Sequence, residues 1–135
     1  MKAFIATLAC LISLSVSNIQ AHATNSEVHP DATVTIRNKS SYTITVKVMK
    51  EQGGLHSQVV VEPQGSKLVS FPKSGNFYTK TKAEKGLETL YKMGNTFNVY
   101  CEEDGYTEGS LEFYVSSTGG ASGQSISKAE FEKNY

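Results

Sequence analysis

The feature that most restricts the fold of this chain is a two-residue alternation of apolar and polar side chains. In the run 32–37, Val34 and Ile36 alternate with threonines and a charged residue, and the run 42–49 repeats the pattern. Successive side chains of a strand point to opposite faces of a sheet, so this alternation is typical of strands with one buried face. The pattern therefore predicts β structure from residue 32 onward.

Further strand-like runs follow, and glycine, proline and polar turns separate them. At one of these turns, Pro63-Gln64-Gly65 predicts a type I turn that begins at Glu62. No long run has the 3.6-residue period of a helix, so the fold class is all-β. We expect a single antiparallel β-sandwich of about seven to eight strands, with a small β-barrel as the alternative. The additional runs are 58–62, 67–71, 76–82, 87–93, 97–102 and 110–116.

Residues 1–23 have the pattern of a secretory signal peptide. Lys2 supplies a positive charge, a mostly apolar stretch follows, and Ala21-His22-Ala23 fits the small-residue cleavage site. The apolar stretch is shorter than the roughly 17–25 residues of a membrane span. The alternatives are an uncleaved membrane anchor and a lipoprotein processed at Cys10. We expect cleavage after Ala23 and a secreted or periplasmic protein without a transmembrane segment.

Removal of this segment leaves 112 of the 135 residues and one cysteine, Cys101, so the mature chain cannot form an intramolecular disulfide. Cys101 shares a predicted strand face with Phe97 and Val99, which is the position of a small buried hydrophobic residue. An intermolecular disulfide is the alternative. His29 and His56 fall in polar segments outside the predicted strands, so neither a Cys/His nucleophilic pair nor a zinc site is supported.

The remaining chain divides into a core domain and two ends. Residues 24–31 are polar and predict a flexible N-terminal tail, and the sandwich occupies 32–117. In 118–135 a Gly/Ser-rich linker precedes a capping box, Ser127 to Glu130, which predicts a short helix over 127–134. That helix needs Ile126 or Phe131 to dock on the core. A frayed tail and a docking peptide for a partner are the alternatives.

The 13 basic and 13 acidic residues of the chain cancel, which argues against nucleic acid as a partner. Their distribution is uneven, because residues 33–92 carry +6 and residues 93–135 carry −5. Neighbouring strands from the two segments would neutralise each other across a sheet, or lysines would line a solvated face. Asn38-Lys39-Ser40 also matches a glycosylation sequon, which matters only in a eukaryotic secretory pathway.

Three tyrosines are predicted to lie opposite the apolar side of their strands: Tyr78, Tyr100 and Tyr114. On adjacent strands they would form an aromatic platform for a glycan or a protein. Lys80 and Lys82 lie beside Tyr78 in the sequence and would add a basic face for an anionic glycan or a lipid headgroup. The structural alternative is that the tyrosines lie at sheet margins and the lysines are ordinary solvated residues.

Acidic residues crowd one predicted hairpin loop and its edge, where oxygen ligands for calcium would meet. They do not match the spacing of an EF-hand loop, and an ordinary solvated acidic turn is the alternative. Some of them would also serve as the acid and base of a small hydrolase, if a cleft held them at a suitable separation. The calcium candidates are Glu102, Glu103, Asp104 and Glu108, and the first three are the hydrolase candidates.

These observations favour one class of function over two others. We expect a non-catalytic binding or interaction module for a protein or a glycan, with no catalytic residue and no cofactor other than the calcium considered above. The second class is a structural envelope or assembly protein that pairs through a sheet edge or through its C-terminal tail. The third class is the small hydrolase.

Overall fold

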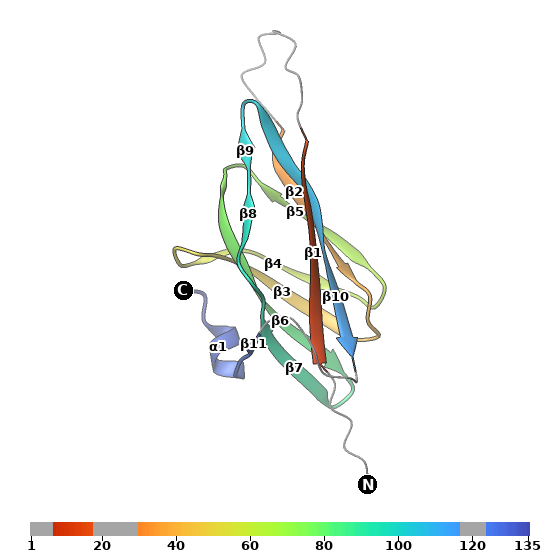
Figure 1. Cartoon of the computed structure of the whole chain (residues 1–135). Coiled ribbons are helices and arrows are strands. Elements are labelled where there is room, and N and C mark those ends of the chain that lie inside the picture. The colour runs from red at the N-terminus through yellow and green to blue at the C-terminus, as the bar shows by residue number, and fades with distance from the viewer. Residues whose placement is uncertain (1–6, 18–29, 117–123) are drawn as a thin grey trace.

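The computed structural model of this chain describes residues 7–17, 30–116 and 124–135, and it shows two sheets packed face to face (Figure 1). Sheet A has the order β1 (Thr7–Ser17), β10 (Gly105–Ser116), β2 (Ala32–Asn38) and β5 (Ser66–Phe71), with β9 (Cys101–Glu102) beside β10. Sheet B has the order β11 (Gln124–Ser125), β7 (Glu88–Met93), β6 (Gly75–Lys85), β3 (Thr43–Lys50) and β4 (Leu55–Val61), with β8 (Phe97–Val99) beside β6. The predicted β-sandwich is therefore confirmed.

The strands pair in antiparallel fashion apart from β2 and β10, which run parallel from Thr33↔Glu108 to Asn38↔Phe113. A parallel pair needs a long connection, and these two strands lie near opposite ends of the described core. Additional short strands arise because the predicted run 97–102 is divided into β8 and β9, and because β11 forms in the C-terminal part.

The core lies between the two sheets and is built from the residues that the alternation marked as inward-facing. Val34 and Ile36 of β2 and Ile44 and Val46 of β3 are all buried and belong to one hydrophobic cluster. Cys101 belongs to the same buried cluster, which confirms its position as a small hydrophobic residue. The alternation therefore identified the inner faces of these strands correctly.

A polar cluster closes the end of the sandwich where β2 leads into β3. The Asn38 side chain is 0% exposed, donates to the carbonyl oxygens of Tyr42 at 2.6 Å and Val61 at 3.0 Å, and accepts from the Ser40 amide at 3.0 Å. Because the amide group is buried and hydrogen-bonded, Asn38 is not accessible for glycosylation in the folded chain. The sequon has a structural role instead.

The turn between β4 and β5 differs from its predicted type. Gly65 donates its amide to the Glu62 carbonyl at 2.9 Å, as expected of a four-residue turn. Gln64 has a φ of 62°, which a type I turn does not allow at its third position and a type II turn requires. The Gln64 side chain donates to the Ser40 carbonyl at 3.1 Å and so ties this turn to the polar cluster around Asn38.

Strand β1 falls within the predicted signal peptide. It pairs antiparallel with β10 along all of its 11 residues, from Thr7↔Ser116 to Ser17↔Tyr106 (Figure 1). The signal peptide and its cleavage after Ala23 stay predictions, and so does the export of the protein. Residues 24–29 of the predicted N-terminal tail (24–31) and the linker at 118–123 lie outside the described residues. None of the helices in the described part of the chain is long and apolar enough to cross a membrane.

The C-terminal segment, residues 124–135, packs on sheet B. Gln124 pairs with Met93 of β7 and Ser125 with Lys92, and α1 (Lys128–Glu132) follows. The N-cap half of the predicted capping box is present, because the Ser127 hydroxyl accepts from the Glu130 amide at 3.1 Å, whereas the Glu130 carboxylate contacts Lys80 and Lys133. The helix ends earlier than predicted, because the chain is extended at Lys133. The docked helix is therefore the correct alternative, and the frayed tail is wrong for these residues.

Candidate functional site

The three tyrosines of the predicted platform lie on different parts of the sandwich. Tyr78 is on β6 in sheet B, Tyr114 is on β10 in sheet A, and Tyr100 lies between β8 and β9. The hydroxyl groups of Tyr100 and Tyr114 donate to the nearby carboxylates of Asp104 and Glu112. The structure therefore does not bring these rings together on one sheet.

The acidic residues of the predicted cation site do not share a ligand, because their carboxylates accept hydrogen bonds from different hydroxyl groups. Glu102 accepts from the Ser74 hydroxyl at 2.8 Å, and Asp104 accepts from Tyr100. A hydrogen bond to Glu108 raises the pKa of the Tyr106 hydroxyl, so this carboxylate also has a tyrosine beside it. Within the described parts of the chain, no group of three or more His, Cys, Asp or Glu side chains is placed to hold a metal ion, and Glu103 joins no such group.

A small pocket of about 280 Å³ opens near His56, between the end of β3 and the turn before β6. Lys50, Lys73 and Asn76 also line it. The imidazole of His56 stacks on Phe71 with ring centroids 4.5 Å apart, and its Nε2 atom lies 2.9 Å from the Ser70 carbonyl. These contacts give the ring a packing role in the wall of the pocket. His29, the other histidine considered above, lies outside the described residues.

The most unusual chemistry lies on the outer side of sheet B, where two lysines stand directly opposite each other. The register of β3 and β6 pairs Lys47 with Lys80. Lys47 is 6% exposed and Lys80 is 0% exposed. Like charges on directly opposite residues destabilise a sheet, and a buried ammonium group needs hydrogen-bond acceptors. This pair therefore requires a set of oxygen atoms above it.

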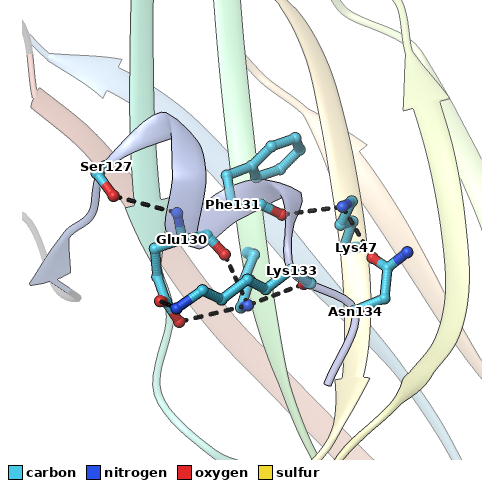
Figure 2. A network of polar contacts seen from close by, with 7 residues as sticks. Lys47, Ser127, Glu130, Phe131, Lys133 and Asn134 are labelled. Atoms are coloured by element: carbon cyan, nitrogen blue, oxygen red, sulfur yellow. Dashed lines mark hydrogen bonds and ion pairs between the residues drawn. The ribbon is translucent and has the colours of Figure 1, made fainter.

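The C-terminal segment supplies those oxygen atoms (Figure 2). The Lys80 ammonium donates to the carbonyls of Glu130 at 2.8 Å and Lys133 at 3.0 Å. The Lys47 ammonium donates to the Phe131 carbonyl and the Asn134 side-chain oxygen, both at 2.9 Å. The last carbonyl groups of a helix have no partner within the helix, and its C-terminal end favours positive charge. The lysine pair therefore supplies both the donors for these carbonyls and the positive charge at the C-terminal end of α1.

An ion pair and an aromatic ring complete this site. The Glu130 carboxylate lies 3.5 Å from the Lys80 ammonium, which joins the acidic C-terminal part of the chain to its basic middle part. The Phe131 ring is buried 5.5 Å from the Tyr91 ring, and the ammonium groups of Lys47 and Lys82 lie 4.7 and 5.8 Å from its centroid. Phe131 is thus the residue that docks the helix, one of the two candidates predicted for that role.

These contacts correct the predicted basic face of Tyr78, Lys80 and Lys82. Tyr78 and Lys82 are half-buried, but Lys80 is covered completely by the C-terminal segment. Burial lowers the pKa of the Lys47 ammonium, and the adjacent charge of Lys80 lowers it further. A hydrogen bond from Lys133 lowers the pKa of the Glu130 carboxyl against the opposing effect of its burial, and the charge of Lys80 adds to the lowering. The face is therefore an occupied binding site for a peptide segment.

Acid is expected to loosen the C-terminal segment through Glu130. A carboxyl whose pKa is lowered by folding stabilises the folded form at every pH above its ordinary, unfolded pKa. This contribution is lost as the pH falls through the folded pKa. Protonation removes the negative charge that faces Lys80 of β6 and Lys133 beyond α1. We expect the amide NMR signals of Ile126 and Phe131 to shift toward those of an undocked peptide between about pH 5 and pH 3.

The variant Glu130→Gln should remove this acid response, because glutamine does not titrate. Glu132→Gln on the same helix is the matched control, since the Glu132 carboxylate pairs with the exposed Lys128 at 3.9 Å. An acid response that Glu130→Gln leaves unchanged would show that another group controls the docking.

The Lys47–Lys80 pair was not predicted from the sequence. Both lysines stand in alternating strands where outward residues are normally solvated, and the register that pairs them depends on how β3 meets β6. The capping box and Phe131 were the signals for a docked helix, but they do not identify the strands that receive it.

No protein-family model, curated protein or solved structure matches this chain.

Proposed function

We propose that this protein is an exported, non-catalytic interaction module that binds an extended strand of a partner along β10. The observation that carries the proposal is the pairing of β10 with Thr7–Ser17, a segment that the sequence predicts to be removed on export. This is the sheet-edge form of the assembly protein considered from the sequence. Neither the tyrosine platform nor the acidic loop supplies a comparable surface.

Cleavage after Ala23 would leave the outer edge of β10 without its 11 paired residues. An unpaired strand edge presents a row of amide and carbonyl groups, which is a template for a strand from another chain. Recognition by strand addition uses these main-chain groups for affinity and alternate side chains for specificity. The mature protein would therefore have a long edge suited to this kind of binding.

The register indicates the pattern that a partner strand should have. The buried residues Leu111 and Phe113 of β10 stand opposite Ile12 and Cys10. Directly opposite residues of an antiparallel pair lie on the same face of a sheet. A partner strand is therefore expected to carry an apolar residue at every second position. The apolar positions of β1 that meet inward positions of β10 are Leu8, Cys10, Ile12, Leu14 and Val16.

One hydrogen bond shows which amide groups of β10 point toward this edge. The Phe113 carbonyl accepts from the Lys39 amide at 2.9 Å, on the β2 side of the strand. The amide and carbonyl of one residue point to the same side of a strand, and neighbouring residues alternate. Ser110 therefore directs its amide to the opposite side, toward β1. Proline at this position removes one amide from the outer edge and leaves the β2 ladder in place.

The variant Ser110→Pro is expected to weaken strand binding at least tenfold, since it removes a hydrogen bond and places a ring at the edge. The measurement is calorimetric titration of the mature chain, beginning at Thr24, with a synthetic peptide of residues 7–17. The peptide carries Cys10→Ser and flanking lysines for solubility. Mass spectrometry of the exported protein first determines whether cleavage follows Ala23.

Ser70→Pro provides the matched control on β5, the opposite edge of sheet A. The Ser70 carbonyl points to His56 and away from β2, so its amide lies on an outer edge as well. Equal peptide binding by the parent protein and Ser110→Pro would overturn the proposal. An exported protein that keeps Thr7–Ser17 would also overturn it, because β1 would then be a permanent strand.

A further inference from the structure

We propose that the Lys47–Lys80 pair forms a peptide-binding site that accepts the C-terminal segment of a second copy of this chain as well as its own. The site lies on sheet B, whereas the strand-binding edge proposed above lies on sheet A. The inference therefore goes beyond the proposed function and does not depend on it.

The chemistry of the site defines its ligand narrowly. Two buried ammonium groups on adjacent strands need several oxygen acceptors, and carbonyls at the end of a short helix provide them. Tyr91 and the lysine side chains receive one aromatic ring, and Lys80 receives one carboxylate. A peptide ligand must therefore combine a helical turn, a phenylalanine on it and an adjacent glutamate. Residues 124–135 of this chain contain all three.

The C-terminal segment is a self-contained ligand. Its helix has its own N-cap at Ser127, and Lys128 and Glu132 pair within it at 3.9 Å. Its hydrogen bonds to the rest of the chain reach β3, β6 and β7 of sheet B, whereas the preceding strand, β10, belongs to sheet A. A segment from a second copy would make the same contacts, so exchange between copies loses none of them.

In each chain, its own tethered C-terminal segment competes with the segment of a second copy for the Lys47–Lys80 site. A segment on a short connector has an effective concentration of the order of millimolar, so the chain's own segment occupies the site in dilute solution. Two complementary variants remove this competition. Phe131→Ala weakens the segment and leaves the site intact, whereas Lys80→Met weakens the site and leaves the segment intact. Methionine keeps an unbranched side chain in the buried position.

The test mixes the two full-length variants and measures their association by sedimentation velocity. We expect a 1:1 complex in the mixture at about 100 µM, in which the intact segment of one chain occupies the intact site of the other, and monomers for each variant alone. The complex should persist when both chains also carry Ser110→Pro, which separates this contact from pairing along β10. Lys67→Met replaces an exposed lysine of β5 and serves as the matched control for Lys80→Met.

A second measurement covers the case in which Lys80→Met does not fold. A fluorescent peptide of residues 124–135 is titrated into full-length Phe131→Ala and into the parent chain. We expect at least tenfold tighter binding to Phe131→Ala, because its own segment no longer competes. A mixture that remains monomeric, or a peptide that binds neither protein, would overturn the proposal and show that the site recognises only its tethered segment.

Discussion

Replacing Asn38 with alanine is expected to lower the free energy of unfolding by about 3 kcal/mol, because it leaves buried main-chain groups without partners. The Asn38 amide is the donor for the carbonyls of Tyr42 at 2.6 Å and Val61 at 3.0 Å. Its oxygen is the acceptor for the amide and the hydroxyl of Ser40 at 3.0 and 2.6 Å. Alanine supplies none of these hydrogen bonds, and the site is closed to water.

Urea denaturation followed by circular dichroism measures this loss. Asn98→Ala is the matched control, because the Asn98 side chain donates to Asn76 at an exposed position. Its expected effect is below about 0.5 kcal/mol. Asn38→Asp should be more harmful than Asn38→Ala, since a carboxylate would face the carbonyls that the amide group now binds. A midpoint equal to that of Asn98→Ala would contradict the structural role of Asn38.

Replacing Phe71 with alanine is expected to lower the free energy of unfolding by about 4 kcal/mol, within the usual range for a buried phenylalanine. Phe71 is completely buried at the end of β5, and its ring centroid lies 4.7 Å from that of Phe77. The same ring supports the imidazole of His56 at 4.5 Å. The substitution therefore removes core volume and the stacking surface that positions one wall of the small pocket.

Leu68→Ala on the same strand is the matched control, because Leu68 is 60% exposed and its loss leaves no cavity. Thermal unfolding of the two variants should differ by more than 10 °C, since 1 kcal/mol corresponds to about 4–8 °C in a domain of this size. The ring protons of His56 should also shift in the NMR spectrum of Phe71→Ala. Equal melting temperatures would show that the aromatic cluster contributes little to the core.

The sequence predicted most of the fold because its signals were local. Val34 and Ile36 alternate with polar residues, and the structure places both on the inner face of β2. The capping box at Ser127 likewise predicted α1, since an N-cap depends on residues three positions apart. The turn at Gln64 was assigned the wrong type, because Gln64 has a positive φ and its side chain contacts Ser40, which lies far away in the sequence.

The candidate sites were predicted less well, because they depend on which strands become neighbours. Tyr78 and Tyr114 have similar local patterns, yet one belongs to sheet B and the other to sheet A. Lys80 has the pattern of a solvated lysine and is instead the most buried charge of the C-terminal docking site. Whether an outward-pointing residue is buried depends on what packs over its sheet. Lys80 is covered by the C-terminal segment, whose Glu130 lies 50 residues further along the chain.

The sequence by itself determined the β-sandwich class, the inward faces of the central strands, the buried position of Cys101 and the short C-terminal helix. Each of these follows from a period or a spacing within a few residues. Only the tertiary structure decided that Lys47 stands opposite Lys80, that the C-terminal segment covers the pair, and that Thr7–Ser17 lies along β10. These features depend on strand register and sheet order, which are set by the packing of the whole core rather than by any local run of residues.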